Sequence, residues 1–135
     1  MEVMMSLQTA GTFLVYFVAA VVAESLFLTL YMATTKHNEL PLIKEGNVAA
    51  AISLGGAVLG FTLPLASAIS QSVSLIDMAV WSAVALVVQL AVLMIVELLL
   101  REISDRISKG SVAAGITLAS ASLSIGVINA ASMTY

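Results

Sequence analysis

The sequence predicts an all-α integral membrane protein with four transmembrane helices, built as two two-helix repeats of parallel orientation with both termini outside. Two features predict this fold. The composition is 61% hydrophobic and only 10% charged, whereas charged residues make up about 25% of soluble domains. The second half of the chain also repeats the first half at an offset of roughly 64 residues, which indicates a fold made from copies of one unit. We therefore expect one membrane domain over residues 1–135.

Four apolar stretches are each long enough to span a bilayer, for which a helix needs about 20 residues. The first has no basic residue before it, and it is longer than the apolar core of a secretory signal peptide, which is about 7 to 15 residues. We therefore expect it to be retained as a helix. The four stretches are 10–33, 47–70, 76–100 and 111–133.

The repeat is clearest where residues 43–54 align with residues 107–118. Asn47 and Ser111 occupy equivalent positions after a glycine, and both residue types favour the N-cap of a helix. Because each copy holds two helices, the copies have the same orientation and are related by an axis along the membrane normal. The two repeats cover about 10–70 and about 76–134.

The basic residues predict the orientation in the membrane. All of them lie in the two connections that follow the first and third stretches, and the positive-inside rule places these connections in the cytoplasm. The turn at 71–74 and both termini are then outside. The aromatic residues agree, because Trp81 and Tyr135 fall near the outer interface and Tyr31 near the inner one. The basic residues are Lys36, Lys44, Arg101, Arg106 and Lys109.

Small residues predict which helices pack together. On the second stretch Gly56 and Gly60 form a GxxxG pattern, which allows two transmembrane backbones to approach closely. Pro64 removes one backbone donor and predicts a kink or hinge in the same helix. The fourth stretch has an equivalent face of mostly small residues. We therefore expect the second and fourth helices at the centre and the first and third outside.

Three polar side chains at membrane depth form the candidate site, of which Glu24 is the most costly to insert, at about 2.5 to 3.5 kcal/mol. In one reading Glu24 is a proton or cation site that acts with Gln89. In the other it is a protonated carboxyl that links helices by a hydrogen bond to Gln89, Ser25 or a hydroxyl of the second helix. Asn129 in the fourth helix can donate and accept, and we expect it to link helices. Both readings of Glu24 stay open.

The two connections between the apolar stretches contain few residues that could form an active site or a metal site. Glu97 and Arg101 are predicted to form an exposed i,i+4 pair near the inner interface. His37 and Glu39 supply too few ligands for a metal site, and we expect a surface imidazole. Loops of about ten residues are too short for a catalytic domain, and the sequence has no HExxH motif or Ser-His-Asp arrangement. We expect no enzyme activity, no metal and no cofactor.

Composition excludes further classes of partner. The chain has no cysteine, which excludes disulfides and thiolate metal sites. Its net charge of −3 gives no reason to expect a nucleic-acid partner.

Residues 37–51, 56–68 and 129–134, together with Trp81 and Gln89, closely resemble the YjfL family of small bacterial inner-membrane proteins. The resemblance covers nearly the whole chain from residue 31 onward and is least distinctive in the first helix. It implies a bacterial inner (plasma) membrane protein of a family defined as a domain of unknown function, and it implies no site residues.

Two functions fit these observations. The first is a small channel or carrier for an ion or small solute, which requires a homo-oligomer because four helices are too thin to enclose a wide path. The second is a membrane anchor or adaptor that recruits a soluble cytoplasmic partner or anionic lipid through the basic connections.

Overall fold

The computed structural model describes residues 1–133. Tyr135, expected at the outer interface, lies outside the described residues, as does the end of the second repeat at 134. The described residues are helical with no strand, and four of the helices are long and apolar enough to span a membrane, as predicted. In chain order the helices are α1 (Glu2–Thr34), α2 (Glu39–Lys44), α3 (Val48–Gln71), α4 (Leu75–Leu99), α5 (Ile103–Ser108) and α6 (Val112–Ser132).

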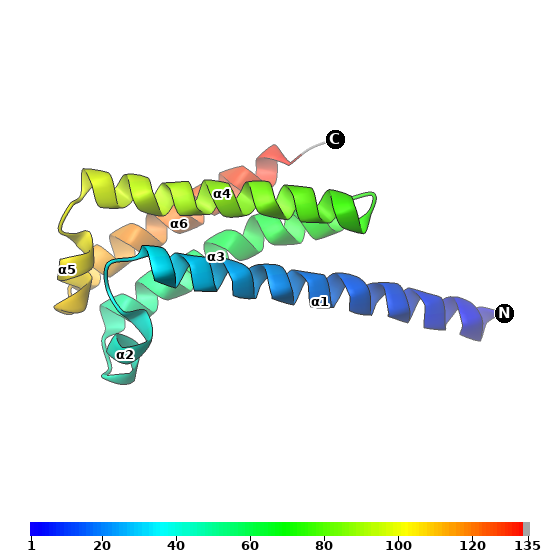
Figure 1. The fold of residues 1–135 in the computed structure, drawn as a ribbon, viewed down its shortest axis with the longest axis horizontal. Coiled ribbons are helices and arrows are strands. Elements are labelled where there is room, and N and C mark those ends of the chain that lie inside the picture. The colour runs from blue at the N-terminus through cyan, green and yellow to red at the C-terminus, as the bar shows by residue number, and fades with distance from the viewer. Residues whose placement is uncertain (134–135) are drawn as a thin grey trace.

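The long helices lie close to their expected positions, with one exception. α3, α4 and α6 each begin and end within one residue of the predicted stretch. α1 begins at Glu2 rather than near residue 10, and its backbone hydrogen bonds already start with Met5 N–H donating to Met1 O. Its 33 residues correspond to about 50 Å, longer than the bilayer core of about 30 Å. The N-terminal part of α1 accordingly projects beyond the other helices (Figure 1).

The connections are not simple loops, as the sequence had suggested, but contain the short helices α2 and α5. Both lie at the same end of the bundle (Figure 1). After each short helix comes a glycine with φ of +87°, Gly46 and Gly110, a conformation that is costly for residues with a Cβ. Asn47 and Ser111 then cap α3 and α6, each accepting a hydrogen bond from a backbone N–H three residues later.

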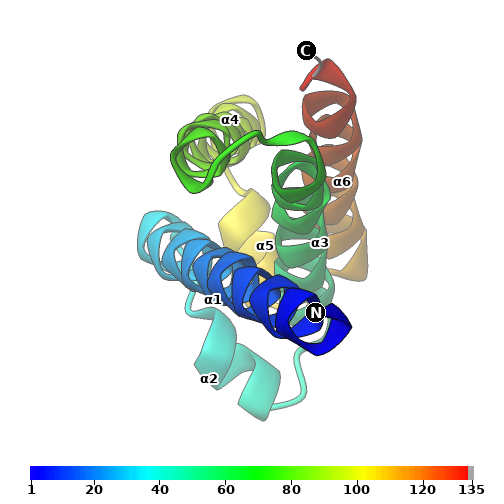
Figure 2. The ribbon, with the colours of Figure 1, turned by 90° about the vertical axis from the view of Figure 1, so that its right-hand side faces the viewer.

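α3 and α6 pack together along their lengths, as the small-residue faces predict. A Cβ on Gly56 would lie 2.4 Å from the Cβ of Ala119, and a Cβ on Gly115 would lie 2.5 Å from Ala49 O. Residues early in α3 therefore contact residues early in α6, so the two helices are parallel. Figure 2 shows them side by side.

Pro64 lies inside α3, which continues as one helix to Gln71. Its missing N–H leaves the carbonyl of Gly60 without the usual intrahelical donor. That carbonyl faces α6, because a Cβ on Gly126 would lie only 2.2 Å from Gly60 O. Of the glycines in this interface, the one with the least room for a Cβ therefore faces the carbonyl that a proline has freed. The hinge expected at Pro64 stays a prediction.

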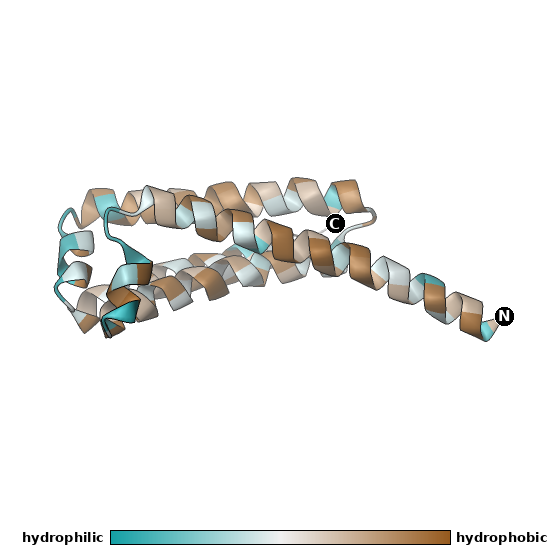
Figure 3. Ribbon diagram, turned by 60° about the horizontal axis from the view of Figure 1, so that its bottom comes forward, coloured by the Kyte–Doolittle hydropathy of each residue, from teal (hydrophilic) through white to brown (hydrophobic). Residues whose placement is uncertain are grey.

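α1 and α4 cover the outside of the α3–α6 pair. Among the residues of α1 only Phe27 and Tyr31 are fully buried, and α1 diverges from the other helices toward its N-terminus (Figure 2). Apolar residues run along all the long helices, and hydrophilic residues gather around α2 and α5 (Figure 3). The outer faces of the long helices thus suit contact with lipid.

Candidate functional site

Glu24 lies where α1 meets α3, at the edge of the bundle. Its Oε2 accepts a hydrogen bond of 3.0 Å from Thr62 Oγ1. Its Oε1 is buried and has no hydrogen-bond partner among the described residues. Thr62 itself is exposed on the outside of the bundle. One oxygen of the carboxyl group therefore has a hydrogen-bond partner and the other has none. The group lies next to the exposed, lipid-facing surface of the bundle.

Gln89 and Asn129 instead lie in the interior and link α4 to α6. Gln89 Nε2 donates to Ser122 O at 3.1 Å, and Asn129 Nδ2 donates to Ala85 O at 3.5 Å. Gly60 leaves the space that Gln89 occupies, since a Cβ there would be 2.9 Å from Gln89 Nε2. Both amides accordingly stabilise helix packing.

The structure does not join Glu24 to Gln89. Glu24 contacts Thr62 and Gln89 lies beside Gly60, and residues two apart on a helix point about 200° away from each other. The two polar side chains therefore have similar depth but lie on different sides of α3. The repeat offset predicted their depth, but it carried no information about the direction of each side chain.

A second group of polar side chains lies at the end of the bundle that carries α2 and α5. We call this end of the bundle the basic end. It draws on the end of α1, the α1–α2 connection, α2, α4 and α5. All of its members are at most 9% exposed. We call this group the loop-end cluster, and it consists of Tyr31, Thr35, His37, Glu39, Glu97 and Ser104.

The loop-end cluster is joined by short polar contacts. His37 Nε2 lies 3.5 Å from Glu39 Oε1, and His37 Nδ1 lies 3.0 Å from Ser104 Oγ. Ser104 Oγ in turn donates to Glu97 Oε1 at 3.1 Å. Thr35 Oγ1 donates to Glu39 Oε1. A continuous row therefore runs from one buried carboxyl group to another.

Two predictions about these residues are wrong. His37 is not a surface imidazole, because its side chain is 0% exposed; the short helices that the sequence did not reveal cover it. Glu97 does not pair with Arg101, because α4 ends at Leu99 and the i,i+4 geometry is lost. Glu97 is buried and accepts from Ser104 instead. A clue in the sequence was the concentration of His37, Glu39 and Glu97 at one end of the helices.

Burial dominates the electrostatics of this cluster. It lowers the pKa of the His37 imidazole, while the negative charges of Glu39 and Glu97 act in the opposite direction. The ion pairs of the described basic side chains lie elsewhere, at Arg106–Glu102 (3.9 Å) and Lys109–Asp105 (3.0 Å), both exposed. Among the members of the cluster, His37 is the side chain that could become a cation.

The serine of the cluster is buried and is already engaged in a hydrogen bond. Ser104, His37 and Glu39 are the residue types of a hydrolytic triad. Ser104 is only 5% exposed, however, and its hydroxyl donates to Glu97. Within the described chain, no group of three His, Cys, Asp or Glu side chains is placed to hold a metal ion.

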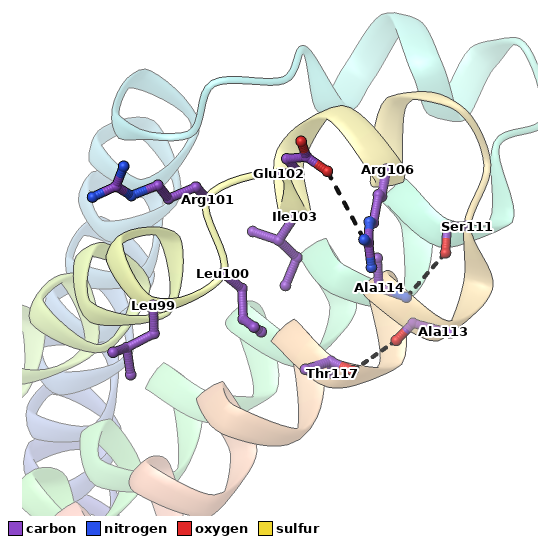
Figure 4. Close-up of a pocket in the computed structure, with 10 residues that line it drawn as sticks. All are labelled: Leu99, Leu100, Arg101, Glu102, Ile103, Arg106, Ser111, Ala113, Ala114 and Thr117. Carbon is purple, nitrogen blue, oxygen red and sulfur yellow. Dashed lines mark hydrogen bonds and ion pairs between the residues drawn. The ribbon is translucent and has the colours of Figure 1, made fainter.

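A groove of about 480 Å³ opens beside α5 at the basic end. Arg106 lies over it and pairs with Glu102, whereas Arg101 extends away from the groove (Figure 4). Leu99, Leu100 and other apolar residues form one wall. A wall of this kind beneath arginine side chains is typical of the boundary between lipid tails and headgroups.

Comparison with known proteins gives the family. A family described as Domain of Unknown Function (DUF350) matches residues 4–133. The UPF0719 inner membrane protein YjfL of Escherichia coli (strain K12) is 40% identical over 123 residues, covering 91% of this chain and 93% of that protein. The UPF0719 transmembrane protein YshE of Bacillus subtilis (strain 168) is 34% identical over 84 residues, covering 62% of this chain and 63% of that protein. No solved structure gives a significant match.

These similarities agree with the four apolar helices. The relatives are inner-membrane and transmembrane proteins by name, which confirms the resemblance seen in the sequence. The chain therefore belongs to the DUF350 family and is a multi-pass protein of the bacterial inner membrane.

Proposed function

We propose that this protein is an oligomeric channel or carrier for protons or small cations, with Glu24 in the conducting path and no enzyme activity. The observation that carries the proposal is the position of Glu24, a carboxyl group at membrane depth with a hydroxyl partner on one side and an unpartnered oxygen on the other. Acidic side chains in a membrane face protein or water because exposure to lipid is costly. A further polar contact is therefore expected at this site.

The path in this proposal runs between copies of the chain rather than through one copy. The interior is filled by apolar side chains with at most 1% exposure, including Phe27, Phe61, Leu93 and Leu118. Phe27 and Phe61 stack with ring centroids 4.5 Å apart. Gln89 and Asn129 use their amides to hold helices together. The outer side of α1 and the exposed Thr62 are left to meet a second copy, in a closed cyclic assembly.

The proposal also includes the internal repeat and the orientation of the chain in the membrane. α3 and α6 are parallel, and residues about 64 positions apart in the chain contact each other, such as Ala49 and Gly115. Both observations support two copies of one unit, related by an axis along the membrane normal. In this arrangement the basic end is cytoplasmic and both termini are external.

Reconstituted flux tests this function. Purified protein in liposomes should move protons or small cations, measured with an internal pH dye and with cation-selective dyes. Glu24→Gln should remove the pH dependence of flux, because the amide keeps the shape but cannot titrate. Thr62→Val should alter flux because it removes the donor to Glu24.

The matched control is Thr29→Val, since the Thr29 hydroxyl on α1 donates only to the backbone carbonyl of Ser25. It should leave flux unchanged. Flux no greater than that of empty liposomes, or identical flux for wild type and Glu24→Gln from about pH 5 to about pH 9, contradicts the proposal.

The alternative is an anchor or adaptor that uses the basic end. It is favoured by the groove under Arg106 and by Lys36, Lys44 and Arg101, for which the described structure shows no ion pair. Each basic residue near an anionic surface adds about 1 kcal/mol. An adaptor predicts binding that weakens when these residues are neutralised, and it predicts no flux.

A further inference from the structure

The three contacts between Glu39 and Glu97 need more hydrogens than the groups in that row supply. Three contacts form the row from Glu39 through His37 and Ser104 to Glu97, at 3.5, 3.0 and 3.1 Å. Each contact needs one hydrogen, because two facing lone pairs repel each other. A neutral imidazole supplies one and a serine hydroxyl supplies one, whereas carboxylates supply none. The row is therefore one hydrogen short.

We infer that the loop-end cluster is a buried proton-binding site, which takes up one proton beyond the neutral imidazole and the two carboxylates and thereby completes the row from Glu39 to Glu97. The ligand of this site is the proton itself. The inference holds whether or not the protein conducts ions.

The burial of one atom in the row, His37 Nε2, also supports this inference. His37 Nε2 has no hydrogen-bond partner, although the side chain is 0% exposed. It faces Glu39 Oε1 at 3.5 Å, beyond the usual range of about 2.7 to 3.2 Å for a hydrogen bond between nitrogen and oxygen. A proton between Nε2 and Oε1 would draw these two atoms together.

The extra proton can occupy either end of the row. When Glu39 holds it, Glu39 donates to His37 Nε2, Nδ1–H donates to Ser104, and Ser104 donates to Glu97. A concerted shift then moves the Glu39 proton to Nε2, the Nδ1 hydrogen to Ser104 Oγ, and the serine hydrogen to Glu97. His37 ends as its other neutral tautomer, and one proton has passed from Glu39 to Glu97.

The surroundings of His37 favour a shared proton over a fixed imidazolium. The titratable groups whose charges act on it are Glu39 from α2 and Glu97 from α4, and the Tyr31 hydroxyl from α1 interacts with the same two carboxyl groups. α5 contributes only Ser104, and the residues of α3 and α6 include no titratable side chain. Burial lowers the pKa of His37 and the two carboxylates oppose this. The imidazole is thus disfavoured as a permanent cation.

Glu39→Gln is the decisive variant. Its amide N–H₂ can donate to His37 Nε2, so all three contacts are satisfied without a proton from solvent. The matched control is Glu45→Gln, the same change at the exposed C-cap of α2. Unfolding equilibria in detergent are measured from about pH 7 to about pH 9, and nitrogen NMR of the ring reports its tautomer. The chain has a single histidine, so the assignment is direct.

Wild type and Glu45→Gln should unfold more readily as pH rises over this range, because the folded state loses the extra proton. One proton corresponds to at most about a tenfold increase in the unfolding constant per pH unit. Glu39→Gln should lack this contribution. The wild-type ring near pH 7 should be neutral, with hydrogen on Nδ1 while Glu39 holds the proton and on Nε2 while Glu97 holds it.

Equal pH slopes in wild type and Glu39→Gln would overturn the inference. So would a flat wild-type profile, which is the result if a water molecule supplies the third hydrogen. If Glu39→Gln does not fold, Glu97→Gln tests the other end of the row. Its amide can donate to Ser104 Oγ, and the same loss of pH dependence is expected.

Discussion

The contact between α3 and α6 can be tested by adding a single methyl group. In Gly126→Ala the new Cβ would lie 2.2 Å from Gly60 O and 2.8 Å from Gly60 Cα. Ordinary carbon–oxygen contacts are about 3.3 to 3.6 Å, so the helices must separate locally by roughly 1 Å. Both contacting atoms belong to backbone, and no side chain can rotate away. We expect a loss of about 3 kcal/mol, the upper end of the usual range for overpacking.

The matched control is Gly55→Ala, because a Cβ on Gly55 meets nothing within 4 Å. Higher helix propensity should make this variant neutral or up to about 1 kcal/mol more stable. Reversible unfolding in mixed micelles gives both free energies. Equal stability of Gly126→Ala and Gly55→Ala would refute the close approach of the two backbones.

Two further outcomes are expected. Asn47→Ala should cost about 2 kcal/mol because it removes both the cap of α3 and the 2.8 Å bond from Nδ2 to Ile107 O, whereas Asn47→Ser should keep the cap and lose less. Cysteines placed at Ser72 and Lys109 in this cysteine-free chain should react with an impermeant reagent from opposite sides of the membrane.

Residue patterns predicted the long helices well, because a helix that spans a membrane needs a continuous apolar stretch of about 20 residues. Apolar length defined α3, α4 and α6 to within one residue, and Gly56 and Gly60 indicated the face that meets α6. These properties depend on each helix alone or on one neighbour.

The loop-end cluster was missed because it depends on several elements at once. α2 and α5 have only six residues each, too few for a periodic pattern, and their positions decide whether His37 is covered. The sequence was misleading at Glu97. Its spacing from Arg101 suggested an i,i+4 pair on the surface, but α4 ends at Leu99, two residues before Arg101. Burial that arises from tertiary packing of short helices leaves little trace in local sequence.

The pairing of α3 with α6 has a consequence for synthesis in the cell. α6 (Val112–Ser132) leaves the ribosome after α3, yet it covers the glycine face of α3, which emerges some sixty residues earlier. During that interval the Gly60 carbonyl faces lipid or a temporary partner in the insertion machinery. A nascent chain stopped between α4 and α6 should therefore remain associated with that machinery, and chains should be released only after α6 has been inserted.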